Sequence, residues 1–155
     1  MNKTNAMRML ETVKINFTAR EYDVSDGEIS GTAVAAKLGV ECERVFKTLV
    51  ASGRDTGLCV FVIPSSEELD LKKAAKAAGD KNIEMIKSRE LEPNTGYVHG
   101  GCSPIGMKKL FPTFIDETAL LFDTIFVSGG RVGLQIEIAP PDLSNMVSAV
   151  FCDIF

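Results

Sequence analysis

The chain has 155 residues, of which 45% are hydrophobic and 25% charged, and its net charge is −4 at pH 7. This composition is typical of a globular domain and gives no bulk attraction to nucleic acid. Residues 1–155 are therefore expected to form a single domain. No apolar run approaches the roughly 18 residues of a membrane span, and the N-terminus leads into no signal-peptide core. We expect a cytoplasmic protein without a membrane partner.

The cysteines and the histidine argue against a metal site. Cys42, Cys59, Cys102 and Cys152 lie far apart without a C-x-x-C spacing, and His99 is the single histidine. A structural zinc site would need almost all of them to converge, and disulfides are rare in a reducing compartment. The phosphate-binding patterns G-x-G-x-x-G and G-x-x-x-x-G-K-[ST] are absent as well. The sequence therefore predicts no metal and no cofactor.

Periodicity and turn residues predict the elements of the first half of the chain. Apolar residues at helical spacing predict helices over 5–14, 32–38 and 66–78. Gly39 and Gly79 directly follow the second and third of these and are expected to end them. Alternating or continuous apolar residues predict strands over 15–21, 46–51 and 58–63. The turn over 52–57 predicts that the last two strands form a hairpin.

The second half is expected to be richer in strands. Short apolar segments predict strands over 83–86, 96–98, 111–115, 124–127, 134–138 and 150–152. Two prolines and an aspartate over 140–142 predict the start of a last helix. Strands and helices mix without strict alternation, so the sequence predicts an α+β domain with a mixed sheet and packed helices, and not a Rossmann fold.

Two glycine-rich turns are the first candidate site elements. The stretch TGYVHGGCSPIGMKK, residues 95–109, contains Gly100 and Gly101, which allow a ligand to approach bare backbone N–H groups. Pro104 is expected to begin a short helical turn just after this pair. A second turn, VSGG, follows the apolar run over 125–127. One such turn is weak evidence, because most Gly-Gly pairs are plain turns, but two at strand ends together with a lysine in an apolar run form a candidate constellation.

A lysine inside an apolar run is the third candidate. Lys47 stands in VFKTLV, and burying its ammonium is costly unless a carboxylate, a phosphate or a cavity receives it. The alternative is an edge-strand lysine that reaches water. Spacing alone leaves both interpretations open. Tyr22 and Thr48 cannot be distinguished from ordinary packing residues by the same reasoning.

The glycine loop also holds a candidate nucleophile. His99 and Cys102 are three residues apart, which permits a Cys/His pair. No carboxylate nearby is available to orient the histidine. The sequence therefore favours loop residues without a catalytic role over a dyad.

At this point a family resemblance becomes specific. The segments VFKTLV, ELDLKKAAKAAG, TGYVHGGCSPIGMKK, FPTFID and IFVSGGRVGLQIEI together resemble the YbaK/EbsC family of Cys-tRNA(Pro)/Cys-tRNA(Cys) deacylases, relatives of the editing domain of bacterial prolyl-tRNA synthetases. The resemblance covers residues 7–154. It implies a mostly antiparallel mixed sheet or partial barrel with packed helices. It also implies trans-editing, the release of cysteine from tRNA after mischarging.

The resemblance also implies the site residues. The expected catalytic residues are Lys47, Gly100 and Gly101. The expected substrate-binding residues are Tyr22, Ile29, Ser30, Thr48, Ser103, Pro104, Gly106, Ser128, Gly129, Gly130 and Gln135. Two of these positions depart from the family pattern. Better-known members carry an aspartate where Gln135 stands, and an aromatic residue near Ile29 or Ser30.

The implied mechanism explains the missing catalytic machinery. In this family the cysteinyl thiol of the substrate attacks its own ester carbonyl and leaves as a cyclic thiolactone, so the enzyme need only orient the groups and stabilise the oxyanion. N–H groups of Gly100 and Gly101 suit the oxyanion, and Lys47 would anchor the terminal ribose or phosphate or donate toward the carbonyl. The implied partners are the 3′ end of aminoacyl-tRNA and prolyl-tRNA synthetase.

Two alternatives remain open from the sequence. One is a related deacylase of other specificity, for example one that removes alanine from Ala-tRNA(Pro) with a bound water. The other is a non-catalytic module that binds tRNA or the synthetase. Lys47 and both glycine turns argue against this second alternative.

Overall fold

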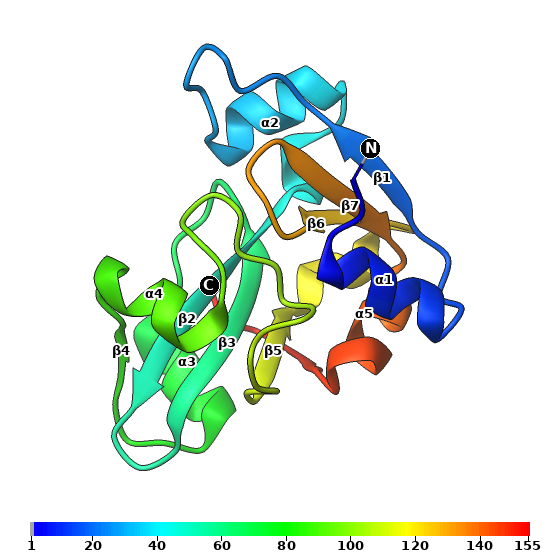
Figure 1. Ribbon diagram of the computed structural model, residues 1–155. Coiled ribbons are helices and arrows are strands. Elements are labelled where there is room, and N and C mark those ends of the chain that lie inside the picture. Colours follow the sequence, from blue (N-terminus) through cyan, green and yellow to red (C-terminus); the bar gives the residue numbers. More distant parts are fainter. Residues whose placement is uncertain (1) are drawn as a thin grey trace.

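The computed structural model describes residues 2–155, which form two β-sheets and five α-helices (Figure 1). The helices are α1 (Asn5–Thr12), α2 (Gly31–Leu38), α3 (Leu71–Ala78), α4 (Ser88–Thr95) and α5 (Pro140–Val147), with 3₁₀ turns η1 (Cys42–Arg44) and η2 (Glu117–Leu121). The strands are β1 (Thr18–Glu21), β2 (Phe46–Gly53), β3 (Gly57–Pro64), β4 (Ile83–Met85), β5 (Thr113–Asp116), β6 (Ile125–Ser128), β7 (Leu134–Ile138) and β8 (Val150–Cys152).

The strands form two sheets, which one isolated backbone bridge connects. The larger has the order β4-β2-β3-β5-β8, and the smaller has the order β1-β7-β6. Four of the six strand pairs are antiparallel, and the pairs β3–β5 and β5–β8 are parallel. A parallel bridge between Val45 and Phe126 links β6 to the start of β2. The predicted α+β domain with a mixed, mostly antiparallel sheet is confirmed, and the sheets do not close into a barrel.

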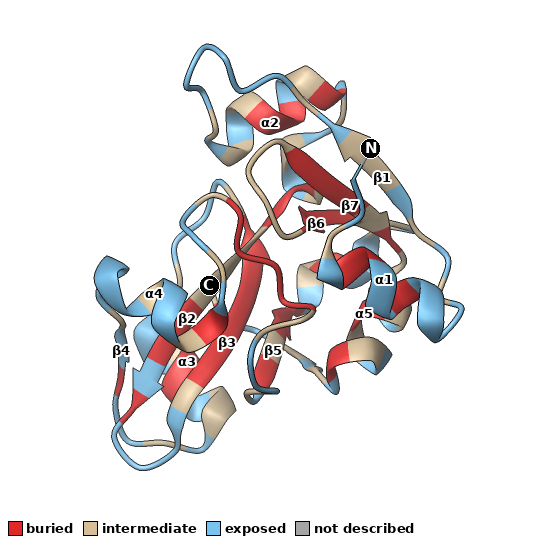
Figure 2. Ribbon diagram, in the orientation of Figure 1, coloured by how far each residue is buried: buried red, intermediate tan, exposed pale blue. Residues whose placement is uncertain are grey.

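Two apolar clusters hold the larger sheet between them. Phe46, Val62 and Ile115 point into the main core, which also receives the inner faces of α1, α5 and the smaller sheet. Phe61 and Ile63 point to the opposite face, where α3 covers them. Buried residues therefore run along β3 and along β6 and β7 of the smaller sheet (Figure 2). No helix within residues 2–155 is long and apolar enough to cross a membrane.

Most predicted elements are confirmed, and their ends follow from local hydrogen bonds. The hairpin of β2 and β3 forms with paired ends at Gly53 and Gly57. The predicted helix over 66–78 begins only at Leu71, because the Asp70 side chain accepts the N–H groups of Lys72 and Lys73 and acts as its N-cap. The predicted first strand is likewise shorter and begins at Thr18.

Three details of the prediction are wrong. Residues 88–95 form α4, a helix that its polar composition and the internal Pro93 concealed. Gly96 ends this helix with φ of 86°, a left-handed conformation, so the predicted strand over 96–98 does not form. The expected helical turn at Pro104 is a bend instead, in which the Ser103 hydroxyl accepts the N–H of Ile105.

Asp80 links the β2–β3 turn to the start of β4, and we expect it to make stability depend on pH. Its carboxylate accepts the Thr56 hydroxyl and the N–H groups of Asp55, Thr56, Lys81 and Asn82. These bonds hold the pKa of Asp80 well below its usual range, with the Thr56 hydroxyl as the largest cause. A depressed folded pKa stabilises the protein above the unfolded pKa of about 3.9, and this contribution is lost as pH falls through the folded value.

Asp80→Asn is therefore expected to lower the melting temperature at pH 7 by several degrees. The difference from wild type should shrink as pH falls below about 4, because the Asp80 carboxylate of the unfolded wild type then binds a proton while that of the folded protein is still ionised. Thermal melts from pH 2 to pH 7 measure this, with Asp142→Asn as the control carboxylate. A difference that stays constant across this range would contradict the assignment.

Candidate functional site

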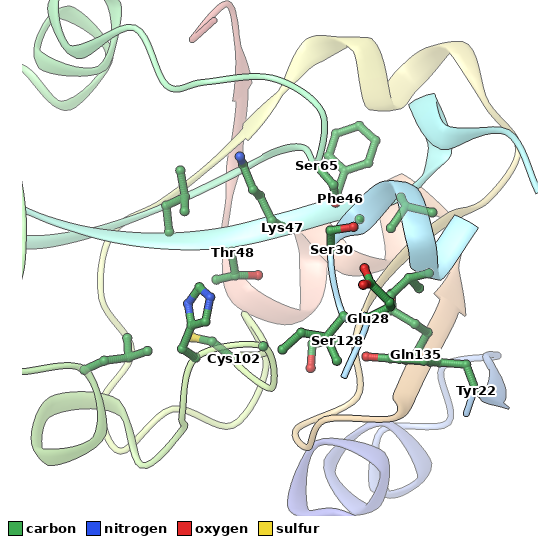
Figure 3. A pocket seen from close by; sticks show the side chains of 18 of the residues that line it. Tyr22, Glu28, Ser30, Phe46, Lys47, Thr48, Ser65, Cys102, Ser128 and Gln135 are labelled. Atoms are coloured by element: carbon green, nitrogen blue, oxygen red, sulfur yellow. The ribbon is translucent and has the colours of Figure 1, made fainter. Parts of the chain in front are cut away.

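A cavity of about 560 Å³ lies where the two sheets and α2 meet (Figure 3). Four segments build it: the first half of β2, the segment over 27–31 that leads into α2, the loop over 99–102, and the facing ends of β6 and β7. Its size is in the range of small-ligand sites. The lining residues are Tyr22, Gly27, Glu28, Ile29, Ser30, Gly31, Val34, Val45, Phe46, Lys47, Thr48, Leu49, Ser65, Leu91, His99, Gly100, Cys102, Ser128 and Gln135.

Strand β2 presents an open edge to this cavity. β4 pairs only with residues 51–53 of β2, and the Ile86 N–H donates to the Val50 carbonyl at 3.3 Å. Backbone groups in an antiparallel ladder alternate between the two edges of a strand. The N–H and carbonyl of Thr48 therefore face the same edge as those of Val50, beyond the end of β4. This edge offers a ligand a backbone donor and acceptor.

Lys47 and Thr48 lie on opposite sides of β2. Figure 3 shows the Lys47 ammonium on one side of the strand and Thr48 on the other, toward Cys102. Lys47 is half-buried, and no ion pair or hydrogen bond joins its ammonium to any other residue within 2–155. The lysine is thus a cavity-lining charge without a structural partner in the described part of the chain.

The N-terminal end of α2 forms a second wall. Ser30 caps this helix by accepting the N–H of Ala33 at 3.2 Å. At Gly31 a Cβ atom would lie only 1.9 Å from the Cβ of Ser65, so a glycine is needed for the helix to pack on the end of β3. This contact brings the first turn of α2 to the same cavity as Lys47.

The two glycine turns pack directly against each other. Gly100 has φ of 84°, and a Cβ atom there would lie 2.9 Å from the Ile29 side chain. A Cβ atom on Gly101 would lie 2.9 Å from the backbone nitrogen of Val132, which follows the second turn. The two glycine turns, which are far apart in the sequence, therefore lie in direct contact beside the cavity.

The expected donor role of Gly101 needs correction. Its N–H donates to the Val98 carbonyl at 3.0 Å, and Gly101 does not line the cavity. Gly100 and Cys102 do line the cavity, and the hydrogen bonds formed among residues 2–155 use neither of their N–H groups. The donors that this loop offers a ligand are thus the N–H groups on either side of Gly101.

The expected site residues fall into two sets, according to whether they line the cavity. Those that line the cavity are Tyr22, Ile29, Ser30, Lys47, Thr48, Gly100, Ser128 and Gln135. Those that lie outside its lining are Gly101, Ser103, Pro104, Gly106, Gly129 and Gly130.

The outer set holds the turns in shape. The Gly129 N–H donates to the Leu134 carbonyl at 2.9 Å, and the Gly130 N–H donates to the Ser128 hydroxyl at 3.2 Å. Gly106 has φ of 80°, and a Cβ atom there would lie 2.9 Å from the Tyr97 hydroxyl oxygen. The residues outside the lining thus stabilise the backbone of the two glycine turns through hydrogen bonds and close packing.

Two cavity-lining residues carry buried polar atoms without a partner. Gln135 on β7 is 6% exposed, and its Oε1 makes no hydrogen bond with the described residues. The Thr48 Oγ1 is buried and equally unpartnered. Buried polar atoms are nearly always hydrogen-bonded in folded proteins. These two oxygens are therefore free to accept a hydrogen bond from water or from a ligand in the cavity.

Cys102 is not suited to act as a nucleophile. Its side chain is 8% exposed, and burial raises the pKa of its thiol to about 12. The thiol is therefore protonated at neutral pH, whereas a nucleophilic cysteine acts as the thiolate. His99 is exposed, and no hydrogen bond within residues 2–155 joins it to Cys102. The preference for loop residues over a dyad agrees with this geometry.

Sequence reasoning missed part of the lining. Glu28 contributes a carboxylate from a polar loop that carries no recognisable motif, and Leu91 comes from α4, a helix that was not expected. Phe46 and Leu49 lie directly before and after Lys47 and Thr48 on β2, so their positions along that strand could have predicted that they also line the cavity.

The family of the chain follows from comparison with known proteins. The family of aminoacyl-tRNA editing domains matches residues 30–146, which include every segment of this cavity except Tyr22 and residues 27–29. This chain belongs to that family. Membership of this family indicates aminoacyl-tRNA deacylase activity.

Three relatives illustrate the range of this similarity. A protein from Enterococcus faecalis named "Putative Cys-tRNA(Pro)/Cys-tRNA(Cys) deacylase EbsC" is 49% identical over 152 residues, 98% of this chain and 93% of that protein. A proline–tRNA ligase from Thermosipho melanesiensis is 29% identical over 97 residues, 63% of this chain and 17% of the ligase. A crystal structure described as "a putative trans-editing enzyme for prolyl tRNA synthetase" shares the fold with a TM-score of 0.86 at 23% identity, and the match covers 99% of this chain and 98% of that one.

Proposed function

We propose that this editing domain is a cytoplasmic trans-editing deacylase that releases cysteine from Cys-tRNA(Pro) and Cys-tRNA(Cys). The observation that carries the proposal is a cavity with unpaired backbone and side-chain polar groups beside a cysteine that is protonated at neutral pH. Such a site can bind and orient an ester, but its cysteine cannot attack one as a thiolate. We assign the nucleophile to the thiol of the substrate, as the family resemblance implies. The 49% identity to the Enterococcus faecalis protein supports the choice of cysteine.

The proposed reaction balances within the substrate. The cysteinyl sulfur forms a bond to its own ester carbonyl carbon, and the bond from that carbon to the ribose oxygen breaks. The proton of the thiol ends on the ribose hydroxyl, and cysteine leaves as a four-membered thiolactone. We assign stabilisation of the oxyanion to the N–H groups of Gly100 and Cys102; both residues line the cavity and neither N–H is otherwise bonded within 2–155, which supports this assignment.

Lys47 is assigned to the nucleotide side of the substrate. Its ammonium lies across β2 from Thr48 and the loop that carries Cys102, so it is poorly placed to reach the same carbonyl (Figure 3). The first turn of α2 lines the cavity too, and backbone N–H groups at a helix N-terminus favour a phosphate. We therefore assign Lys47 to the phosphate or ribose of the terminal nucleotide.

Prolyl-tRNA synthetase is the proposed partner in the cell. A chain with a net charge of −4 can neutralise few tRNA phosphates, so its own affinity for tRNA is expected to be weak and salt-sensitive. A synthetase that hands over the mischarged tRNA would supply the missing affinity. The similarity to part of a proline–tRNA ligase supports this pairing.

A deacylation panel tests the proposed function. Purified protein is incubated with Cys-, Ala-, Ser- and Pro-tRNA(Pro) and with Cys-tRNA(Cys), and release of labelled amino acid is compared with spontaneous hydrolysis. We expect rapid release from both cysteinyl esters and background rates for the other three. Release of alanine would favour the alternative specificity, and binding without any release would favour a non-catalytic module.

A further inference from the structure

Glu28 is an exposed residue that lines the cavity, and its carboxylate has no partner among the described residues. It is the acidic residue among the lining residues, and its side chain forms no ion pair within residues 2–155. Its side chain is drawn with that of Gln135 on the side of the cavity away from the Lys47 ammonium (Figure 3). One positive and one negative side chain thus line the cavity without forming an ion pair with each other.

The loop that carries Glu28 is held in place by a lysine on α2. The Lys37 ammonium donates to the Glu28 carbonyl at 2.8 Å, to the Asp23 carbonyl at 2.6 Å and to Asp26 Oδ1 at 2.8 Å. Asp26 Oδ1 in turn accepts the N–H of Glu28 at 3.0 Å. Lys37 therefore neutralises Asp26 and fixes the Glu28 backbone, while the Glu28 carboxylate stays free.

Gln135 adds an acceptor to the lining of the same cavity. It is 6% exposed, and its buried Oε1 lacks a hydrogen-bond donor among the described residues. A carboxylate and an unpartnered amide oxygen together form a site for a cation that carries N–H donors. The α-ammonium of an aminoacyl ester is such a group.

We propose that Glu28 and Gln135 bind the α-ammonium of the aminoacyl group, an assignment that rests on the proposed deacylase function. Glu28 supplies the charge and Gln135 Oε1 a hydrogen-bond acceptor. In the cysteinyl ester the ammonium and the carbonyl carbon are bonded to Cα, and the thiol is one carbon further away, on Cβ. Binding the ammonium in one position therefore limits the orientations in which the thiol can approach the carbonyl carbon. Glu28 thereby supplies the negative charge that Gln135 lacks.

Binding of two non-hydrolysable analogues tests this assignment without relying on catalysis. The first is 3′-cysteinylamido-3′-deoxyadenosine, and the second is its 3-mercaptopropionyl counterpart, which lacks only the amine. Calorimetric titration at pH 7 gives the affinity ratio of the two. Wild type is expected to prefer the amine by about tenfold, the scale of one charged hydrogen bond.

The variants distinguish the proposed residues from the background. Glu28→Gln should bring the affinity ratio close to one without changing the melting temperature, and Gln135→Leu should reduce it several-fold. Glu68→Gln, a control carboxylate outside the cavity, should keep the wild-type ratio. A ratio near one in wild type, or a full preference in Glu28→Gln, would overturn the assignment. A preserved preference without any deacylation of Cys-tRNA would instead overturn the proposed function alone.

Discussion

Alkylating the thiol of Cys-tRNA(Pro) is expected to reduce its enzyme-catalysed deacylation to the spontaneous rate, whereas Cys102→Ser should retain most of the activity. The substrate sulfur is the proposed nucleophile, so blocking it removes the bond-forming atom. Cys102 cannot substitute for it, because burial raises the pKa of its thiol to about 12 and leaves it protonated. The expected contrast is about a hundredfold or more, the loss typical of removing a catalytic group.

The measurement uses three esters and three proteins. Release of labelled amino acid is followed from Cys-, S-alkylated Cys- and Ser-tRNA(Pro) with wild type, Cys102→Ser and His99→Ala. Ser-tRNA controls for size, since it differs from the cysteinyl ester by a weaker hydroxyl nucleophile. Rapid cleavage of the serine or alkylated ester would refute substrate-thiol attack. Loss of activity in Cys102→Ser alone would restore the Cys/His pair.

Lys47→Ala is expected to lower kcat/KM for Cys-tRNA(Pro) by about a hundredfold while leaving the melting temperature nearly unchanged. The ammonium lines the cavity and has no ion pair or hydrogen bond within residues 2–155, so its loss removes a substrate contact and no protein contact. Its side chain is only half-buried, so truncation leaves little cavity in the core.

A matched lysine keeps this test specific. Lys76 is an exposed residue on α3, outside the cavity, and Lys76→Ala should retain wild-type activity. Steady-state kinetics and circular dichroism of both variants provide the comparison. Near-wild-type activity in Lys47→Ala would mean that the lysine only reaches water, the alternative that its sequence position left open.

Local chemistry explains why much of the fold is predictable from the sequence. The β2–β3 hairpin follows from two apolar runs around a polar turn, and α2 follows from an apolar stripe between the Ser30 cap and Gly39. The contrary cases are also local. In α4 an internal proline masks the helix, and at Gly96 a left-handed glycine ends a helix where a strand was expected.

The sequence alone also determines which residue types are available for chemistry. The chain has one lysine in an apolar strand, two glycine turns and a single histidine. Its residue spacing argues against a metal site, a phosphate-binding glycine loop and a Cys/His pair. The family resemblance then directs attention to Lys47, Thr48, Ser128 and Gln135, which all line one cavity.

Only the tertiary structure decides which polar groups remain free, because hydrogen bonding and burial depend on segments far apart in the chain. The loop packs against Val132, and in this conformation the Gly101 N–H donates to the Val98 carbonyl. The N–H groups without a protein acceptor therefore belong to the residues before and after Gly101. Burial of Cys102 between such segments raises the pKa of its thiol and keeps it protonated. Glu28 belongs to a loop without a motif, and it lines the cavity because Lys37 holds that loop against α2.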